Sequence, residues 1–183
     1  MLEIREEQLR LLNKPLEDGT PRTLGDVTTI NLTMMRSGVQ ANVVPEKASV
    51  VFDIRVTPYA DLARFREQIE TLAAEHGIEV DFKQYSDKAL VTPTDKSNPF
   101  WTALSGVLEA RGIGIFKEVF PAGSDSRFIR RLGIPALGVS PLRNIPVLLH
   151  DHNEYVRESD FLEGIEIYTD LIPALASAPT PKA

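Results

Sequence analysis

Two of the three histidines in the chain lie close together in the stretch PVLLHDHNEYV, residues 146–156. His150 follows three apolar residues, as at the end of a strand, and His152 and Glu154 come shortly after it. Neutral imidazole is a common zinc ligand, and a nearby carboxylate can bind the metal or hold the ring in one tautomer. The stretch is therefore a candidate for part of a metal site. Two surface-loop histidines among solvated acids would give the same pattern, and H-x-H alone favours that second interpretation.

The stretch PAGSDSRFIRR, residues 121–131, has the composition of an anion-binding turn. Gly123 and Ser124 would open a helix, whose free N–H groups and dipole favour a negative charge. Arg127 would lie in the first turn, where its guanidinium can form a paired contact with a carboxylate. Ser124 can equally be an ordinary N-cap, with Asp125 complementing the helix dipole, and both interpretations can hold together. A nucleophilic role for Ser124 is not indicated, because the stretch is not G-x-S-x-G.

A third candidate lies in the stretch GVQANVVPEKASVVFDIRV, residues 38–56. Asp53 and Arg55 share the polar face of an alternating strand, which most often indicates a solvated ion pair of little energetic value. Arg55 could instead face a cleft and bind an anionic substrate. Asn42, shortly before Pro45, is more typical of a turn residue than of a ligand contact.

The first half of the chain must position Asn42 and Arg55, and its pattern is that of an α+β sandwich. Apolar spacing predicts helices over residues 2–13 and 59–77, the second ending at Gly77. Alternation predicts strands over residues 27–35, 48–56 and 78–85. The order helix–strand–strand–helix–strand is the split βαβ, ferredoxin-like arrangement without its first strand.

The second half alternates helices and strands, as in a layered α/β domain with few strands. A linker over residues 89–98 separates it from the first half. Asn98 would cap the first helix, Pro99 would begin it and Gly112 would end it.

The last predicted helix of the second half would be capped by Ser159. It carries one apolar stripe, formed by Phe161, Ile165, Tyr168 and Ile172. The predicted elements are helices over 98–112, 123–133 and 159–176 and strands over 113–120, 134–140 and 147–150.

Composition excludes several classes of protein. The chain has 183 residues, 43% of them hydrophobic, which suits one ordinary domain or two small ones. Its net charge of −6 and the lack of a Lys/Arg-rich block argue against nucleic-acid partners and anionic membrane surfaces. It has no cysteine, so disulfides, thiolate nucleophiles and cysteine–zinc sites are excluded. No apolar run has the length of a membrane span and the N-terminal stretch is not a signal peptide, so we expect a cytoplasmic protein.

Five stretches together resemble, in chain order, the C-terminal half of the aminoacylases. They are NLTMMRSGVQANVVPEKASVVFDIRV, VTPTDKSNPFW, PAGSDSRFIRRLGIPALGVSP, PVLLHDHNEYV and FLEGIEIYTDLIPALAS. Aminoacylases are zinc enzymes that deacylate N-acyl-L-amino acids, and their metallopeptidase family includes carboxypeptidase G-like and succinyl-diaminopimelate desuccinylase-like enzymes. The resemblance runs from Leu2 to Ser177.

The resemblance implies a fold in which a lid domain interrupts a zinc-binding α/β domain. The lid is a ferredoxin-like sandwich that forms the dimer. On this basis residues 1–90 are an α+β lid and dimerisation domain that lacks its first strand. Residues 91–183 are then the C-terminal portion of the layered α/β zinc-binding domain.

The resemblance also implies roles for the candidate residues. His150 matches the family's last zinc ligand, the first residue of an H-x-x-x-E pattern in which Glu154 is the acid. Glu154 and Asp125 would support the residues in direct contact with metal and substrate. The substrate carboxylate would be received by Arg127 with the Gly123–Ser124 turn, and by the lid residues Asn42 and Arg55.

The family's other metal ligands and its general base have no counterpart in this sequence. They come from an H-x-D motif, a bridging Asp, an adjacent Glu–Glu pair and a further acid. Glu6 and Glu7 lie on the predicted lid helix beside Arg5 and Arg10, as on a solvated face, and His76 does not match the family's lid histidine. We therefore expect a portion of an aminoacylase-like hydrolase that is inactive alone. A non-catalytic dimerisation and ligand-binding module, or a chain completed by a separate partner, would fit the same residues.

Overall fold

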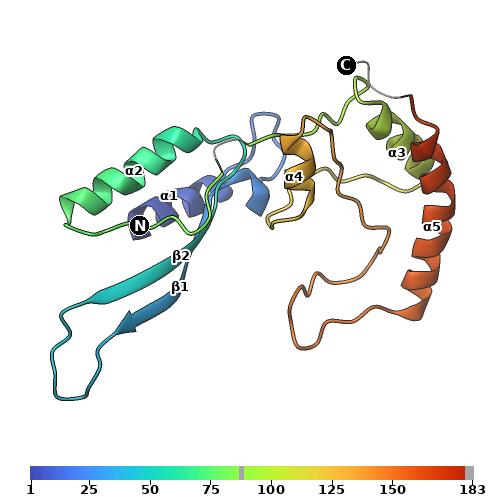
Figure 1. Ribbon diagram of the computed structural model, residues 1–183. Helices are drawn as coiled ribbons and strands as arrows, with labels where there is room; N and C mark the ends of the chain where they lie inside the picture. The colour runs from blue at the N-terminus through green and yellow to red at the C-terminus, as the bar shows by residue number, and fades with distance from the viewer. Residues whose placement is uncertain (87–88, 180–183) are drawn as a thin grey trace. The chain divides into compact units, whose positions relative to one another are not determined.

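The computed structural model describes residues 1–86 and 89–179, which form two compact units (Figure 1). The first unit comprises Met1–Val91 together with Glu118–Ser124. The second unit comprises Thr92–Lys117 and the chain from Asp125 onward. The mixed α/β character predicted from the sequence is confirmed, although the only sheet in the described part of the chain has two strands. Within that part, no helix has the length and apolar composition needed to cross a membrane.

The first unit follows the predicted order helix–strand–strand–helix. Its elements are α1 (Leu2–Leu12), the short 3-10 helix η1 (Leu24–Asp26), β1 (Thr29–Ser37), β2 (Ala48–Arg55) and α2 (Leu62–Glu75). The strands are antiparallel and adjacent, with a bulge between Leu32 and Met34. Helix α1 lies against β1, and the small core of the unit includes Val27 and Ile30, 3% and 2% exposed.

Local chemistry sets the ends of α2. The Asp61 carboxylate accepts a hydrogen bond from the N–H of Arg64, which satisfies one free donor of the first turn. Gly77 has a φ of 64°, the left-handed conformation in which a helix commonly ends. The predicted helix and its predicted end are confirmed. On α1, the exposed pair Glu6–Arg10, 3.6 Å apart, fits the predicted solvated face.

The strand predicted over residues 78–85 is wrong, because this segment forms no ladder. In the split βαβ arrangement the first strand lies between the third and the fourth. The described part of the chain has no strand ahead of α1. Segment 78–85 therefore lacks the neighbouring strand with which it would pair. Side chains hold part of it instead: the guanidinium of Arg66 lies 4.8 Å from the ring centroids of both Phe82 and Tyr85.

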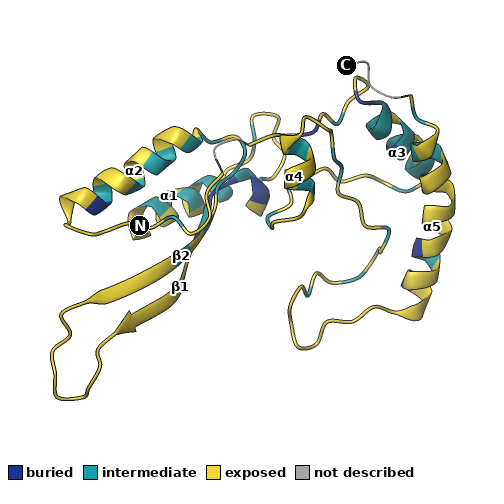
Figure 2. Ribbon diagram, viewed as in Figure 1, coloured by how far each residue is buried: buried dark blue, intermediate teal, exposed yellow. Residues whose placement is uncertain are grey.

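The β1–β2 hairpin is exposed along most of its length (Figure 2). Three of its apolar side chains, Met35, Leu32 and Val50, are 72%, 50% and 49% exposed. An apolar sheet with so little cover is typical of an interaction surface.

The second unit is built from α3 (Pro99–Ala110), α4 (Ser126–Arg131) and α5 (Glu158–Ala176), with α3 packed against α5. Its core contains Leu104, Ile167 and Leu171, which are 5%, 1% and 1% exposed. The side chain of Asn98 accepts hydrogen bonds from the first N–H groups of α3, and Gly112 follows the helix with a φ of 67°. The predicted cap and end of this helix are confirmed.

The strands predicted over residues 113–120, 134–140 and 147–150 are wrong, since none of these described segments forms a ladder. A strand exists only through hydrogen bonds to a neighbour, and nearly continuous apolar strands are typical of sheet interiors with partners on both sides. These segments do not pair with one another, and they remain extended or turn-like.

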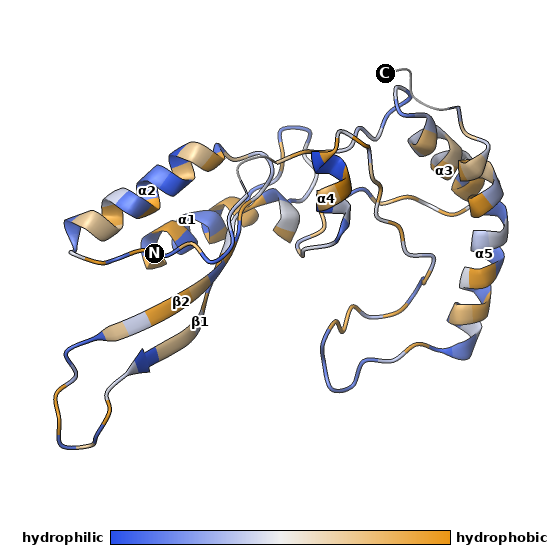
Figure 3. Ribbon diagram, in the orientation of Figure 1, coloured by the Kyte–Doolittle hydropathy of each residue, from blue (hydrophilic) through white to orange (hydrophobic). Residues whose placement is uncertain are grey.

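The apolar stripe predicted on α5 is not the buried face of this helix. The predicted stripe of Phe161, Ile165, Tyr168 and Ile172 is exposed, whereas the buried residues are Asp160, Gly164, Ile167 and Leu171. Apolar residues occur along much of the helix (Figure 3), so the sequence offers two apolar faces. The helix begins at Glu158 with Arg157 at the N-cap position, so the predicted cap by Ser159 is wrong as well.

Candidate functional site

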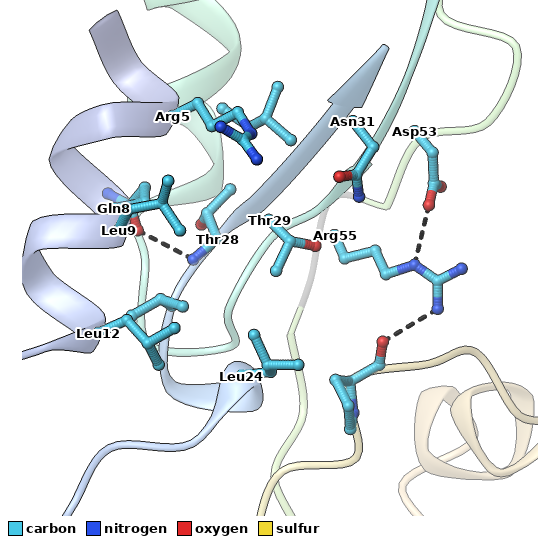
Figure 4. A pocket seen from close by; sticks show the side chains of 13 residues that line it. Arg5, Gln8, Leu9, Leu12, Leu24, Thr28, Thr29, Asn31, Asp53 and Arg55 are labelled. Carbon is cyan, nitrogen blue, oxygen red and sulfur yellow. Dashed lines mark hydrogen bonds and ion pairs between the residues drawn. The ribbon is translucent and has the colours of Figure 1, made fainter. Parts of the chain in front are cut away.

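A pocket in the first unit is lined by Arg55 and by its strand neighbour Asp53 (Figure 4). It has a volume of about 420 Å³ and lies among α1, the start of β1 and the end of β2. Leu9, Leu12 and Leu24 give it apolar walls, and Arg5 and Asn31 add polar groups at its surface. A cavity with apolar walls and a few donors suits a small amphipathic anion.

Arg55 connects the end of β2 to the predicted anion-binding loop. Its Nε donates a hydrogen bond to Asp53 Oδ2 at 2.9 Å, and its Nη1 donates one to the carbonyl of Pro121 at 2.9 Å (Figure 4). A guanidinium has five N–H donors, so others remain for a ligand. The structure thus brings Arg55 into the same unit as Gly123 and Ser124, which follow Pro121 closely.

Within the first unit, segment 118–124 passes close to Gly25, which is buried. A Cβ built on Gly25 would lie 1.9 Å from the carbonyl oxygen of Val119. No side chain fits in that space, so only glycine permits the approach.

We expect Gly25→Ala to force segment 118–124 away and to lower the free energy of unfolding of the first unit by about 1–3 kcal/mol. Urea unfolding followed by circular dichroism measures this loss. Gly106→Ala is the control, because nothing lies within 4 Å of the added Cβ in α3 and the change is expected to stabilise that helix by up to about 1 kcal/mol. Unchanged stability of Gly25→Ala would contradict the observed contact.

Asn42 is not brought to Arg55. It is exposed in the turn that joins β1 to β2, whereas Arg55 pairs with Thr29 at the opposite end of the hairpin. The turn position agrees with the structural interpretation of Asn42. A ligand role for this side chain stays a prediction.

In the second unit Arg127 lies on α4, a helix of six residues. Its guanidinium lies 4.7 Å from the ring centroid of Phe128. The helix begins at Ser126 with Asp125 at the N-cap position and no side-chain cap, so the predicted cap by Ser124 is wrong. Because Asp125 has helical dihedrals, its side chain is not placed to accept the N–H groups of the first turn.

A network that the sequence did not reveal fixes the end of α4. Arg130 donates from Nη2 to the carbonyl of Ala136 at 2.7 Å and from Nε to the hydroxyl of Thr92 at 3.1 Å. The Thr92 hydroxyl also donates to the carbonyl of Ala136 and accepts from its N–H. Nothing in the run RFIRR distinguishes Arg130 from its neighbours, and Thr92 is 44 residues away from Ala136.

The histidine loop does not assemble a metal centre. His150 has a φ of 64°, and His152 is 92% exposed, with its Nδ1 2.8 Å from Asp151 Oδ1. The N–H of Glu154 donates to the carbonyl of Asp151 at 3.3 Å. Over residues 1–86 and 89–179, no three histidine, aspartate or glutamate side chains gather closely enough to hold a metal ion.

Comparison with known proteins defines the class of the first unit and then the relatives of the whole chain. Residues 3–81 match the model of a peptidase dimerisation domain, M20_dimer. The chain is 45% identical over 178 residues to aminoacylase-1 of Mus musculus and 47% identical over 157 residues to aminoacylase-1 of Homo sapiens. The resemblance to aminoacylases is confirmed: the chain is similar to aminoacylase-1 over most of its length, and residues 3–81 match an M20-type dimerisation domain.

These alignments cover most of this chain and less than half of each relative. They include 96% of this chain and 42% of the mouse protein, and 85% and 38% for the human one. Succinyl-diaminopimelate desuccinylase of Xanthomonas euvesicatoria is 27% identical over 150 residues. The fold resembles that of a Bacillus subtilis protein described as a dinuclear metal-binding peptidase of the M20 family, with a TM-score of 0.54 and 18% identity over 97% of this chain and 46% of that one.

Proposed function

We propose that this chain is the substrate-anchoring and dimerisation part of a zinc hydrolase that cleaves N-acyl-L-amino acids. The observation that carries the proposal is the 45% identity to mouse aminoacylase-1 over 96% of the chain. In such a hydrolysis, water cleaves the amide C–N bond and gives the carboxylate of the acyl group and a free amino acid. The substrate keeps one carboxylate throughout, and this is the group that cationic side chains can hold.

The proposed carboxylate anchors are Arg55 and Arg127. The remaining N–H donors of Arg55 adjoin a cavity with apolar walls, which suits a substrate that carries both a carboxylate and a hydrocarbon side chain. Arg127 would contribute a second guanidinium. Gly123 and Ser124 would add polar contacts, and Asp125 would assist beside Arg127. Asn42 lies at the far end of the hairpin from Arg55, so it would contribute from the lid of the second copy in a dimer.

The proposed metal is zinc, and this chain fits it only in part. His150 would supply one imidazole, with Glu154 supporting it, whereas a catalytic zinc site takes three protein ligands. Because no group of three suitable side chains exists in the described part of the chain, these residues do not hold the ion on their own. The other ligands and the general base would come from polypeptide outside the 183 residues. A metal-dependent reaction is supported by the Bacillus relative, which is described as a dinuclear metal-binding peptidase.

We further propose that residues 1–90 are a lid through which two copies form a homodimer, and that residues 91–183 belong to the metal-binding domain. The match of residues 3–81 to a dimerisation domain supports the first part. The exposed apolar side chains of the β1–β2 hairpin provide a surface that a second copy could cover. The cytoplasmic location stays a prediction.

The test is an assay of the native protein that contains these residues, purified from the cells that make it. We expect it to release free amino acid from N-acetyl-L-amino acids and to lose this activity reversibly on chelation of its metal. The 183-residue chain with added zinc is the control, and we expect no turnover from it. A native protein that hydrolyses none of these substrates would overturn the proposal.

A second candidate function is a non-catalytic dimerisation and ligand-binding module. It is favoured by the lack of a metal-binding group among the described residues and by the pocket beside Arg55. A native protein that is dimeric, binds N-acyl-L-amino acids and does not hydrolyse them would support this alternative.

A further inference from the structure

The residues that precede the His150 loop, 141–143, pack against α5. Glu163 and Gly164 lie on the second turn of α5 and both contact the N-terminal side of the loop. Arg143 Nη1 donates to Glu163 Oε1 at 2.9 Å. Gly164 is so close to Pro141 and Leu142 that a Cβ there would lie 3.4 Å from each of them. The start of the loop is therefore held in place by contacts with the second turn of α5.

Arg157 joins the two ends of this loop. Its Nε donates to Asp160 Oδ2 at 2.5 Å, and its Nη2 donates to the carbonyl of Asn144 at 2.5 Å. Asn144 and Arg157 are 13 residues apart, and the segment between them contains His150 and Glu154. A single planar guanidinium thus closes the loop against α5.

The acceptor on α5 is well suited to hold this arginine. Asp160 is only 8% exposed, and its carboxylate hydrogen bond raises the pKa of Arg157 above the usual arginine range. A carboxylate with so little access to water depends on a charged donor, and Arg157 provides it.

The backbone inside the loop needs such support. Asn144 and His150 have φ values of 56° and 64°, and they are the only non-glycine residues with positive φ in the described part of the chain. The left-handed conformation is unfavourable for a residue with a side chain and persists when the surroundings impose it. Arg157 binds the carbonyl of Asn144 directly.

We propose that Arg157 is a positioning residue that fixes the loop over residues 145–156, and with it the backbone of His150, by joining Asn144 to Asp160. The relevance of Arg157 to metal binding rests on the proposed function of His150. The effect of Arg157 on the loop is independent of that function, because the contacts involve only Asn144, Arg157 and Asp160. Lysine cannot replace it fully, since a single ammonium group lacks the planar fork that reaches both acceptors.

The test is amide hydrogen exchange on the full chain, followed from milliseconds to minutes. We expect Arg157→Ala to accelerate exchange of the loop amides, including those of Asp151 and Glu154, by about tenfold, while the amides of α3 and α5 change little. Arg157→Lys is expected to give a smaller acceleration.

Arg111 offers a matched control. It donates from Nε to Asp170 at 2.7 Å and from Nη2 to the carbonyl of Glu166 at 2.8 Å, the same chemistry on a later part of α5. We expect Arg111→Ala to leave exchange in the loop unchanged. The proposal is overturned if Arg157→Ala leaves the loop amides within twofold of the wild type, or if it accelerates exchange equally across the unit. No substrate or metal enters the measurement, so its result is separate from the test of the proposed function.

Discussion

Replacement of Arg55 by alanine is expected to raise the KM of the native protein for N-acyl-L-amino acids about 50-fold. A charge-assisted hydrogen bond to a carboxylate contributes about 1.5–3 kcal/mol, which corresponds to a factor of roughly 10–150 in binding. Arg55 also donates to the carbonyl of Pro121, so its loss would free the segment that carries Gly123 and Ser124. Steady-state kinetics with an N-acetyl-L-amino acid measure the change.

Arg36 is the control for this substitution. It is an exposed arginine on β1 of the same hairpin, opposite Ser49, and it does not line the pocket. We expect Arg36→Ala to leave KM within about twofold of the wild type, because an exposed charge away from the pocket contributes little. Equal KM values for the two variants would show that Arg55 does not anchor the substrate.

Replacement of Leu171 by alanine is expected to lower the free energy of unfolding of the second unit by about 2–5 kcal/mol. Leu171 is 1% exposed and is one of the two largest fully buried side chains in the described chain, with Ile167. The shortened side chain would leave a cavity between α3 and α5, whose packing forms the core of this unit. Urea unfolding, monitored by the single tryptophan, Trp101 of α3, reports the loss directly.

The neighbouring Ile172 makes this experiment decisive. It is 61% exposed, so Ile172→Ala removes similar hydrocarbon from the outer face of the same turn of α5. We expect a change of less than about 1 kcal/mol, partly offset by the higher helix propensity of alanine. A larger cost for Ile172→Ala than for Leu171→Ala would mean that the face predicted from the sequence is the buried one.

The sequence predicted the helices better than the strands, and the reason is the range of the interactions. Asn98, Pro99 and Gly112 act within one turn of α3, so their spacing is sufficient to predict where the helix begins and ends. Residues 78–85 and 134–140 have strand-like patterns, but a strand also needs a neighbour, and a pattern does not show whether one exists. The face of α5 was predicted incorrectly because both of its sides carry apolar residues.

The candidate site was predictable as residue types and not as contacts. The hydrogen bond from Arg55 to Pro121 joins residues 66 apart, and the approach of Gly25 to Val119 depends on a backbone that the sequence does not describe. The role of Arg157 was not predictable either, because one of its acceptors is a backbone carbonyl 13 residues away and the other is a carboxylate whose burial depends on packing. Resemblance to the aminoacylases supplied the roles that spacing alone left open.

If this chain holds the carboxylate of an N-acyl-L-amino acid, as we propose, the native protein discriminates strongly against substrates that lack this group. The most direct test compares kcat/KM of the native protein for an N-acetyl-L-amino acid and for the same compound with its carboxylate converted to an amide. An arginine anchor would form a charge-assisted contact with the acid and would gain none from the amide, so we expect a loss of about 100-fold or more for the amide. Equal kcat/KM values for the two compounds would contradict the account.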